Sequence, residues 1–351
     1  MLRFLLSLII YSAAILTASS DMLRPFRHNQ ALSQQSIRAM ITDKDGYLWI
    51  GTHDGLNRYD GKTIKTFTRV ADDPHSLSSD NIFDFHIDSK GNLWVLTTFA
   101  LNRYQPEFEN FKRYPIKGSV LLANPFVDVE VDEAGRFWVA AENGLYLLEE
   151  EPPGLKRLDV QIPGRIRCLL PNGNHTFYIG TIEGLFEVDM NSLSVEEVDI
   201  GIEATVNTMV ADGHDRLLLG TDEGVLVFDK DLNLLEHFRH ERERMDTLSS
   251  NEVTNVFLDF EGRLWVGTTE GLNLQTTDGK GFTRFFHEPL NELSLTHGEI
   301  TWIYQSQPGL IWIGTHRGLN VIDSISKKFE TIRISGDLGP SEFQAIWDSH
   351  Y

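Results

Sequence analysis

The stretch that decides the fold reads Asp45-Gly46-Tyr47-Leu48-Trp49-Ile50-Gly51-Thr52-His53-Asp54-Gly55-Leu56-Asn57-Arg58-Tyr59-Asp60. Residues 261–273 and 310–320 repeat it closely. In each copy a short apolar run ends in Gly-Thr, a glycine-bearing turn follows, and a second apolar run begins. This order predicts two antiparallel strands joined by a hairpin. Because apolar residues fill successive positions, both faces of each hairpin must be buried.

The repeat recurs at a nearly constant interval along the chain. Seven residues fill the position of the first tryptophan, at intervals of 45, 44, 40, 40, 47 and 47 residues: Trp49, Trp94, Trp138, Tyr178, Leu218, Trp265 and Trp312. An apolar segment precedes each hairpin and another follows it, which makes four short strands per repeat. Four strands in about 40 to 45 residues is the length of a β-propeller blade. We therefore predict an all-β fold, a seven-bladed β-propeller of four-stranded antiparallel blades.

Two copies depart from the pattern. The second has Leu96 and Ala100 where other copies have glycine, and the third has Ala140 and Ala141 in place of Gly-Thr. If the second turn requires a positive φ, Ala100 costs about 1 kcal/mol there. The conformation of this turn stays open, while the regular spacing predicts that both copies are blades.

The two ends of the chain differ from the repeats. Residues 1–20 combine Arg3, an apolar run over residues 4–16 and small residues at 18–20, as in a signal peptide. The run is shorter than the roughly 20 residues of a spanning helix, and an uncleaved membrane anchor is the alternative. Residues 21–335 are the expected propeller domain, and residues 336–351 read as the start of a truncated eighth repeat.

Ring closure requires one blade to combine strands from both ends of the chain. Residues 23–28 resemble a fourth strand and are followed by a typical connector, so we expect them to complete the seventh blade beside residues 319–322. Residues 329–334 compete for the same place. The lone Cys168 lies in an apolar run and lacks a disulfide partner, so we expect it to be buried in a strand.

Composition and motifs exclude several classes of function. The formal charge of −20 disfavours nucleic acid and anionic membranes as partners. The sequence has no Gly-x-Ser-x-Gly elbow, Walker lysine loop or His-Glu-x-x-His helix. Residues 43–46 resemble a fragment of a calcium loop without its later ligands, and a hairpin turn is the better interpretation. We predict no catalytic residue, metal or cofactor, and attribute the repeated tryptophans to packing between blades rather than to sugar stacking.

The turn between the second and third strands of each repeat is the predicted ligand face. These turns lie at the same end of the ring as the connectors between blades, and their residues vary on a repeated scaffold. Solvated turn residues are the alternative interpretation. A ring of these side chains suits a neutral polyol or glycan better than a polyanion. The pairs are His53-Asp54, Thr98-Phe99, Glu142-Asn143, Ile182-Glu183, Asp222-Glu223, Thr269-Glu270 and His316-Arg317.

Three features together resemble the two-component regulator propeller repeats. They are Leu-Trp-Ile-Gly-Thr at residues 48–52, Gly-Leu-Asn-Arg-Tyr-Asp at 55–60, and the Ser-Leu-Ser-Ser connector at 76–79. The resemblance covers roughly residues 22–348. It implies the periplasmic sensor half of a hybrid histidine kinase or diguanylate cyclase, a half that usually has two propellers followed by a smaller β domain, a membrane helix and a cytoplasmic output domain. This sequence shows none of those later parts.

The resemblance favours an exported receptor propeller that binds a small molecule or glycan fragment and passes the signal on within a longer protein, with no catalytic activity of its own. A propeller lyase or glycosidase is one alternative, and it would need carboxylates, histidines or a metal converging on the axis. A protein-binding scaffold without a small ligand is the other. The sequence does not separate the sensor from the scaffold.

Overall fold

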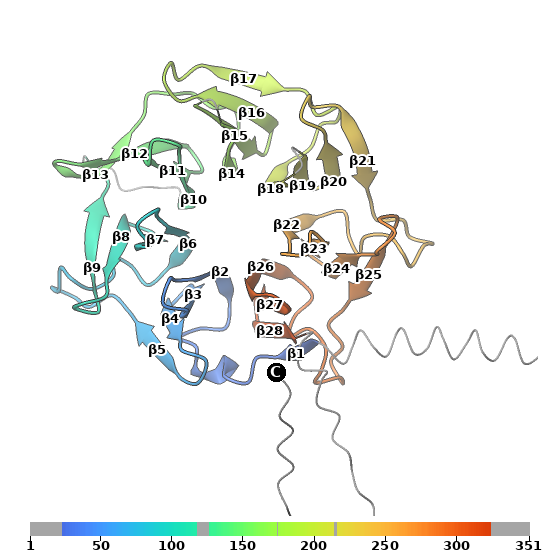
Figure 1. Cartoon of the computed structure of the whole chain (residues 1–351), viewed down its shortest axis with the longest axis horizontal. Helices are drawn as coiled ribbons and strands as arrows, with labels where there is room; N and C mark the ends of the chain where they lie inside the picture. The colour runs from blue at the N-terminus through green and yellow to red at the C-terminus, as the bar shows by residue number, and fades with distance from the viewer. Residues whose placement is uncertain (1–22, 118–125, 174, 214–215, 324–351) are drawn as a thin grey trace, which may run out of the picture.

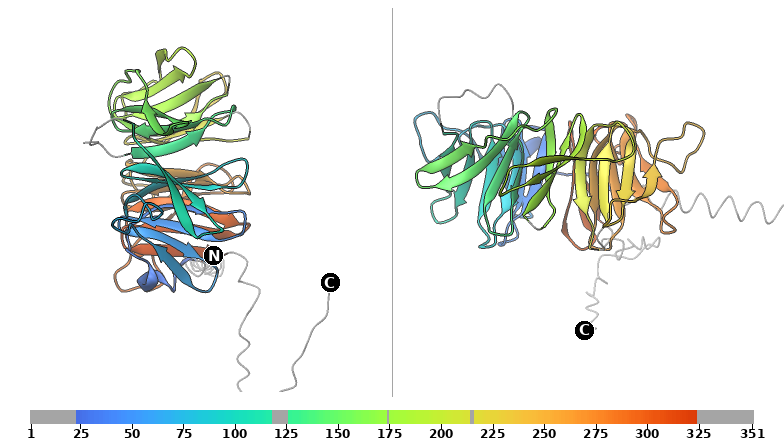
Figure 2. Two further views of the ribbon diagram at one scale, coloured as in Figure 1. Left: turned by 90° about the vertical axis from the view of Figure 1, so that its left-hand side faces the viewer. Right: turned by 90° about the horizontal axis from the view of Figure 1, so that it is seen from above.

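The computed structural model describes residues 23–117, 126–173, 175–213 and 216–323. Within these residues, seven four-stranded antiparallel sheets stand like blades around a central channel (Figure 1). Seen from the edge, the blades form a flat disc (Figure 2). The predicted seven-bladed propeller is confirmed. We number blades 1 to 6 in chain order from β2, and blade 7 contains β26, β27, β28 and β1.

The strands of blades 1 to 6 run outward from the centre of the ring in sequence order, and in blade 7 the outermost place is taken by β1. The first, innermost strands are β2 (Ile37–Thr42), β6 (Ile82–Ile87), β10 (Phe126–Val131), β14 (Ile166–Pro171), β18 (Val206–Ala211), β22 (Val253–Leu258) and β26 (Ile300–Gln307). The second strands are β3 (Leu48–Thr52), β7 (Leu93–Thr97), β11 (Phe137–Ala141), β15 (Thr176–Thr181), β19 (Leu217–Thr221), β23 (Leu264–Thr268) and β27 (Leu310–Thr315). Every residue of β3, β7, β11, β19 and β23 is buried.

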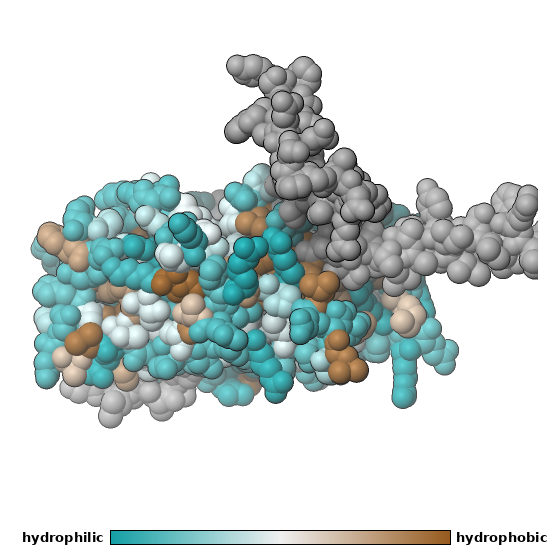
Figure 3. Space-filling view, turned by 90° about the horizontal axis from the view of Figure 1, so that it is seen from below, coloured by the Kyte–Doolittle hydropathy of each residue, from teal (hydrophilic) through white to brown (hydrophobic). Residues whose placement is uncertain are grey.

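The outer half of each blade is more exposed. The third strands are β4 (Gly55–Tyr59), β8 (Ala100–Gln105), β12 (Gly144–Glu150), β16 (Gly184–Asp189), β20 (Gly224–Phe228), β24 (Gly271–Gln275) and β28 (Gly318–Asp323). The fourth strands are β5 (Ile64–Phe67), β9 (Asn110–Pro115), β13 (Pro153–Arg157), β17 (Val195–Val198), β21 (Leu234–Phe238), β25 (Phe282–Phe285) and β1 (Leu23–Pro25). The outer edge of the disc is largely hydrophilic, with scattered apolar residues (Figure 3).

An aspartate organises the turn between the first and second strands of blade 1. One carboxylate oxygen of Asp43 accepts the backbone N–H groups of Asp45 and Tyr47, each at 3.0 Å, and the other accepts the indole N–H of Trp49 at 2.7 Å. Gly46 in the same turn has a φ of +85°, which favours glycine. The predicted hairpin turn at residues 43–46 is therefore confirmed. The carboxylate–indole pair recurs at Asp88–Trp94, Asp132–Trp138 and Asp259–Trp265.

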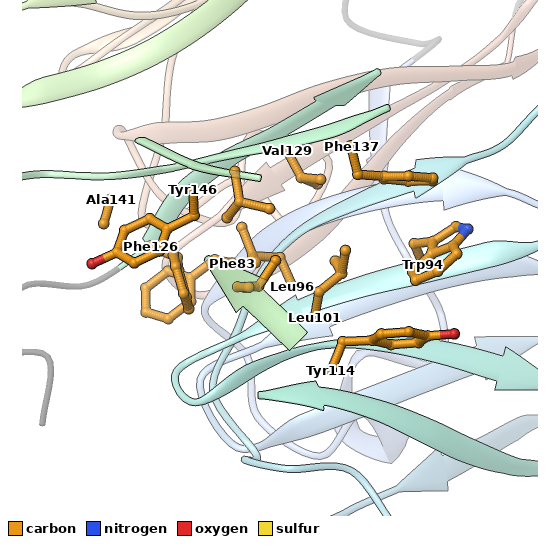
Figure 4. Packing of buried hydrophobic residues seen from close by; sticks show 12 residues of the cluster. Phe83, Trp94, Leu96, Leu101, Tyr114, Phe126, Val129, Phe137, Ala141 and Tyr146 are labelled. Carbon is orange, nitrogen blue, oxygen red and sulfur yellow. The ribbon is translucent and has the colours of Figure 1, made fainter. Parts of the chain in front are cut away.

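Large side chains fill the gaps between blades. Figure 4 shows one such cluster between blades 2 and 3, where the ring centroids of Trp94 and Phe137 lie 4.4 Å apart. The glycine of the Gly-Thr motif lets the next blade approach, because a Cβ on Gly51 would lie 2.6 Å from Ile82. All five repeat-slot tryptophans are at most 5% exposed. Their predicted role in packing between blades is confirmed.

The N-terminal strand closes the ring. β1 pairs antiparallel with β28, in the register Leu23↔Ile322 and Pro25↔Asn320. The adjacent Phe26 packs its ring 5.4 Å from that of Trp312. The predicted closure by residues 23–28 is confirmed. Residues 1–20, 329–334 and 336–351, for which a signal peptide, a competing strand and an eighth repeat are predicted, lie outside the described residues.

The turn of blade 2 differs from the others. Glycine at the start of the third strand has positive φ elsewhere, +131° at Gly55 and +120° at Gly318, whereas Ala100 is not among the positive-φ residues. The strand register of blade 2 ends at the pair Leu96↔Leu101. The Thr97 hydroxyl still donates to the Ala100 carbonyl at 3.1 Å, which holds the turn closed. The alanine is therefore accommodated by a different turn rather than by strain.

Candidate functional site

The channel along the axis is the main cavity among the described residues. It has a volume of about 910 Å³ and is lined by the first strands of all seven blades. One end, which we call the mouth, carries the blade connectors and the turns between second and third strands, and Asp222, Thr269 and His316 from those turns line the cavity.

The structure separates the two members of several predicted pairs. The first residue of a pair contacts a connector between blades, beside the channel. The Nδ1 atom of His53 lies 3.1 Å from the side-chain oxygen of Asn81, and the Glu142 carboxylate lies 3.9 Å from the Arg165 guanidinium. Thr98 accepts a hydrogen bond from Ser79 at 3.2 Å. Two second members contact outer strands instead, since Glu223 pairs with Arg239 and the Asn143 carbonyl accepts from Arg157. The remaining predicted residues are exposed and do not line the cavity: Asp54, Phe99, Glu183, Glu270 and Arg317.

A β-bulge near the mouth interrupts the first strand of every blade. The ladder register shifts at the second residue of β2, β6, β10, β14, β18, β22 and β26. A bulge re-aims a side chain without ending the strand. All seven bulge residues line the channel, and sequence reasoning missed them: Arg38, Phe83, Val127, Arg167, Asn207, Thr254 and Thr301. The signal available was a pair of adjacent positions of variable residue type, the bulge residue and the one after it, flanked on both sides by positions that are apolar in every repeat.

Two of the bulge residues connect neighbouring blades. The Asn207 side-chain amide donates to the Val253 carbonyl at 3.1 Å, and the Thr254 hydroxyl donates to the Ile300 carbonyl at 2.6 Å. These contacts use backbone acceptors at the inner edge of the next blade. Asn207 and Thr254 therefore have a structural role around blades 5 to 7.

Three acidic side chains lie on the channel wall at blades 2 and 3. Asp84 accepts the Val129 N–H at 3.2 Å, and Asp128 accepts the Leu169 N–H at 2.7 Å. Burial, and for Asp84 the charge of Asp128, raises the pKa of both carboxyls. Burial and the charge of Asp128 raise the pKa of Glu130 to about 8. At neutral pH this wall therefore carries less negative charge than its composition suggests.

Histidines gather where blades 7 and 1 meet at the mouth. The His316 ring contacts the Ser36 hydroxyl through Nδ1 at 2.9 Å and the Glu299 carboxylate through Nε2 at 3.3 Å. The ring centroid of His297 lies 6.0 Å from that of His316. Burial and the charge of Arg38 lower the pKa of His53, so it is mainly neutral at pH 7. Within the described part of the chain, no group of three or more histidine, cysteine, aspartate or glutamate side chains is arranged to hold a metal ion.

Cys168 lies on the channel-lining strand of blade 4, as expected from its apolar surroundings. It is buried, and burial raises the pKa of its thiol. Among the described residues no helix is long and apolar enough to cross a membrane.

Blades 1, 2, 6 and 7 share a hydrogen-bonded arrangement that we call the Ser–Thr–Asn lock. In blade 1 the Ser33 hydroxyl bonds the Thr52 hydroxyl at 3.0 Å, and the Ser33 N–H donates to the Asn57 side-chain carbonyl at 2.9 Å. The lock ties the connector to the second and third strands. The equivalent trios are Ser78, Thr97 and Asn102; Ser249, Thr268 and Asn273; and Thr296, Thr315 and Asn320.

A family profile, described as two component regulator propeller, matches residues 31–54, 76–99, 247–270 and 294–317. Each match contains the hydroxyl pair of one lock. Four of the seven repeats therefore match the two-component regulator propeller family. A curated relative, histidine kinase P4 of Formosa agariphila, is 40% identical over 60 residues, which are 17% of this chain and 4% of the kinase.

Solved structures share the fold of this chain. Extracellular domains of two putative hybrid two-component systems from B. thetaiotaomicron match with TM-scores of 0.70 and 0.66 at 21% and 20% identity. They cover 86% and 82% of this chain, which spans only 41% and 38% of them. Virginiamycin B lyase from Staphylococcus aureus matches with a TM-score of 0.64 at 11% identity, over 85% of this chain and 97% of the lyase. At these identities the likeness shows the fold alone.

Proposed function

We propose that this propeller is the ligand-binding sensor module of a longer, exported two-component receptor and has no catalytic activity of its own. The channel mouth is the observation that carries the proposal. All seven blades contribute a bulge residue to one cavity of about 910 Å³, and those residues differ from blade to blade. A repeated scaffold with variable side chains at one opening suits recognition of a small molecule or a glycan fragment.

The proposed setting follows from the family and from the chain's charge. Extracellular domains of hybrid two-component systems have this fold, and the 60-residue relative is a histidine kinase. We infer a periplasmic location, directed by the signal peptide proposed for residues 1–20, and the remainder of a receptor as partner. The excess of 51 acidic over 31 basic residues disfavours nucleic acid as a ligand.

Ligand screening with a matched pair of variants tests this function. The full chain is screened by thermal shift against small sugars, sugar acids and amino acids, and hits are titrated by calorimetry. A mouth variant with Asp222→Asn, Thr269→Ala and His316→Asn should weaken a hit by at least tenfold. A control variant with Asp54→Asn, Glu183→Gln and Glu270→Gln, all outside the cavity, should bind as the parent does. Equal binding by the mouth variant contradicts the proposal.

A lyase is the second candidate, favoured by one constellation at the mouth. Ser36 is hydrogen-bonded to His316, whose other ring nitrogen lies 3.3 Å from the Glu299 carboxylate, and a lyase propeller shares the fold. However, Ser36 is only 6% exposed and joins blade 1 to blade 7, which suits a clasp better than a nucleophile. Product analysis of every bound ligand decides between the two functions: turnover that His316→Asn abolishes supports a lyase, and ligand recovered unchanged supports the sensor.

A further inference from the structure

Arg38 is a cation in the channel that has no ion-pair or hydrogen-bond partner among the residues that the structure describes. It occupies the bulge slot of blade 1, is half-buried and lines the cavity near the mouth. Its guanidinium carbon lies 5.0 Å from the centroid of the Phe83 ring, the bulge residue of the next blade. Across the described ranges, neither an ion pair nor a hydrogen bond engages this guanidinium.

Most other half-buried arginines among the described residues are engaged by neighbouring polar groups, and the exception, Arg103, lies over the Trp94 ring outside the channel. Arg58 bonds the Tyr104 hydroxyl and pairs with Glu109, each at 2.9 Å. Arg113 donates to the carbonyls of Ser76 and Leu77, each at 2.8 Å. Burial alone lowers the pKa of Arg38, so no carboxylate nearby offsets its desolvation. A desolvated charge without a partner disfavours the folded state, which makes a purely structural role for Arg38 a poor explanation.

The position of the Arg38 guanidinium over the Phe83 ring favours a planar anion as its partner. A guanidinium lying over an aromatic face keeps its N–H groups in its own plane, where the ring does not accept them. Two parallel N–H groups match the two oxygens of a carboxylate. His53 lies at the rim beside the Arg38 bulge, because Ile37 pairs with Thr52 across the sheet, and its Nδ1 is engaged by Asn81, which leaves Nε2 for a ligand hydroxyl.

The charges around the mouth limit the ligand to a single negative charge. Asp222, Glu252 and Glu299 line the same cavity from blades 5 to 7. Asp222 accepts the Thr205 N–H at 2.8 Å, and Glu299 faces His316 at 3.3 Å. These carboxylates repel a phosphate or a polycarboxylate, while one carboxylate is matched by Arg38, the half-buried one of the two arginines, Arg38 and Arg167, that line the cavity.

We propose that Arg38 anchors the carboxylate of a small hydroxylated monocarboxylic acid at the channel mouth. This inference rests on the proposed ligand-binding function and names the chemical class of its ligand. Arg38 holds the acid group in its plane above Phe83, and His53 accepts a hydrogen bond from a hydroxyl. The neutral polyol expected from the turn residues would lack the group that Arg38 binds.

Calorimetric titration of the full chain with matched acid and neutral probes tests the proposal. The pairs are gluconate with glucitol, glucuronate with glucose, and lactate with propane-1,2-diol. In at least one pair the acid should bind at least tenfold more tightly, and Arg38→Gln should remove that preference. Arg103→Gln is the matched control, because Arg103 is also half-buried over an aromatic ring, with its guanidinium carbon 5.9 Å from the Trp94 ring centroid, but does not line the cavity, and it should change the Kd less than twofold. Absence of an acid preference in all three pairs, including absence of binding, overturns the proposal.

A second readout needs no ligand. If Arg38 is held free for a ligand, Arg38→Met should leave the melting temperature unchanged or raise it by a few degrees, because an apolar side chain replaces an unpaired charge. A fall of several degrees would make Arg38 a structural brace and overturn the proposal. A neutral sugar that binds at the mouth equally well in the parent and in Arg38→Gln would leave the sensor function standing and refute only this inference.

Discussion

Two arcs of the ring stabilise the same blade in different ways. Blades 6, 7, 1 and 2 are contiguous and each carries a Ser–Thr–Asn lock, with the Asn fully buried at Asn57, Asn102, Asn273 and Asn320. In blades 3, 4 and 5 the asparagine position holds Tyr146, Phe186 and Leu226, and all three side chains are buried.

The locked arc is the one that contains the closure. Blade 7 is completed by β1, which is three residues long and pairs only with β28. Directional hydrogen bonds fix each connector against its blade, whereas apolar packing tolerates small shifts. We infer that the Ser–Thr–Asn locks hold the connectors in place in the arc where the two ends of the chain meet. Apolar packing holds the opposite arc, blades 3 to 5.

Removal of the closing strand should have the largest effect. Deleting residues 21–30 exposes the edge of β28 and removes Leu23 and Phe26, whose burial contributes roughly 3 to 6 kcal/mol. We expect loss of the cooperative melting transition, or a fall of more than 10 °C, in circular dichroism. A deletion variant that melts like the parent would show that another segment closes the ring.

Exchanging the residue types at the asparagine position, apolar for Asn in a locked blade and Asn for apolar in an unlocked blade, should destabilise the protein in both cases. Asn273→Leu in blade 6 leaves the buried Ser249 N–H without its side-chain acceptor and removes the amide's bond to the Val266 carbonyl, at a cost of about 2 to 3 kcal/mol. Leu226→Asn in blade 5 buries an amide among apolar neighbours and should cost about the same. Urea unfolding measures both changes, and exposed Asp278→Asn is the control. A silent Asn273→Leu would mean that the lock contributes little to stability.

Protonation of the channel wall adds a pH dependence on the unlocked side. The folded pKa of Glu130 is about 8, above its ordinary value of 4.5, so folding favours the protonated form. Glu130 therefore does not destabilise the folded state below pH 4.5. Its destabilising effect grows as the pH rises and reaches its full size above pH 8. Glu130→Gln should therefore raise stability by roughly 2 kcal/mol at pH 8 and leave it unchanged at pH 4. Urea unfolding at the two pH values tests this, with Glu270→Gln as control, and equal gains at both would contradict it.

Substitutions in the turns between the second and third strands should have the smallest effect on stability, and this effect should differ between blade 1 and blade 2. Gly55→Ala places a Cβ 3.0 Å from the Ser33 hydroxyl oxygen in a residue with a φ of +131°, and should cost about 1 to 2 kcal/mol. Ala100→Gly should cost at most about 1 kcal/mol, through the entropy of the unfolded chain. Melting temperatures of the two variants provide the comparison. A stabilising Ala100→Gly would show that the alanine strains its turn.

Much of the fold follows from the order of residues in one repeat. The tryptophan slot, the turn at residues 43–46 and the connector preceding it are local patterns, and they predict the blades and their number. The closing role of residues 23–28 also follows, because a fourth strand without its own blade needs an edge. These features depend on neighbours in sequence or on a repeated register.

The site was less predictable because it depends on geometry between blades. The turn pairs were placed at the right end of the ring, but only Asp222, Thr269 and His316 line the cavity. The bulge that directs Arg38 into the channel is a shift in strand register, and a list of residue types does not reveal it. The raised pKa of Asp84 likewise depends on Asp128, 44 residues away in the next blade.

Hydrogen–deuterium exchange of the full chain, with and without a bound ligand from the screen, tests most directly whether the channel mouth is the ligand site. The account predicts slower exchange in peptides that contain the start of β2 and the turns at residues 222, 269 and 316, with little change along the outer strands β5, β17 and β21. Protection confined to the outer strands, with unchanged exchange at the mouth, would contradict it.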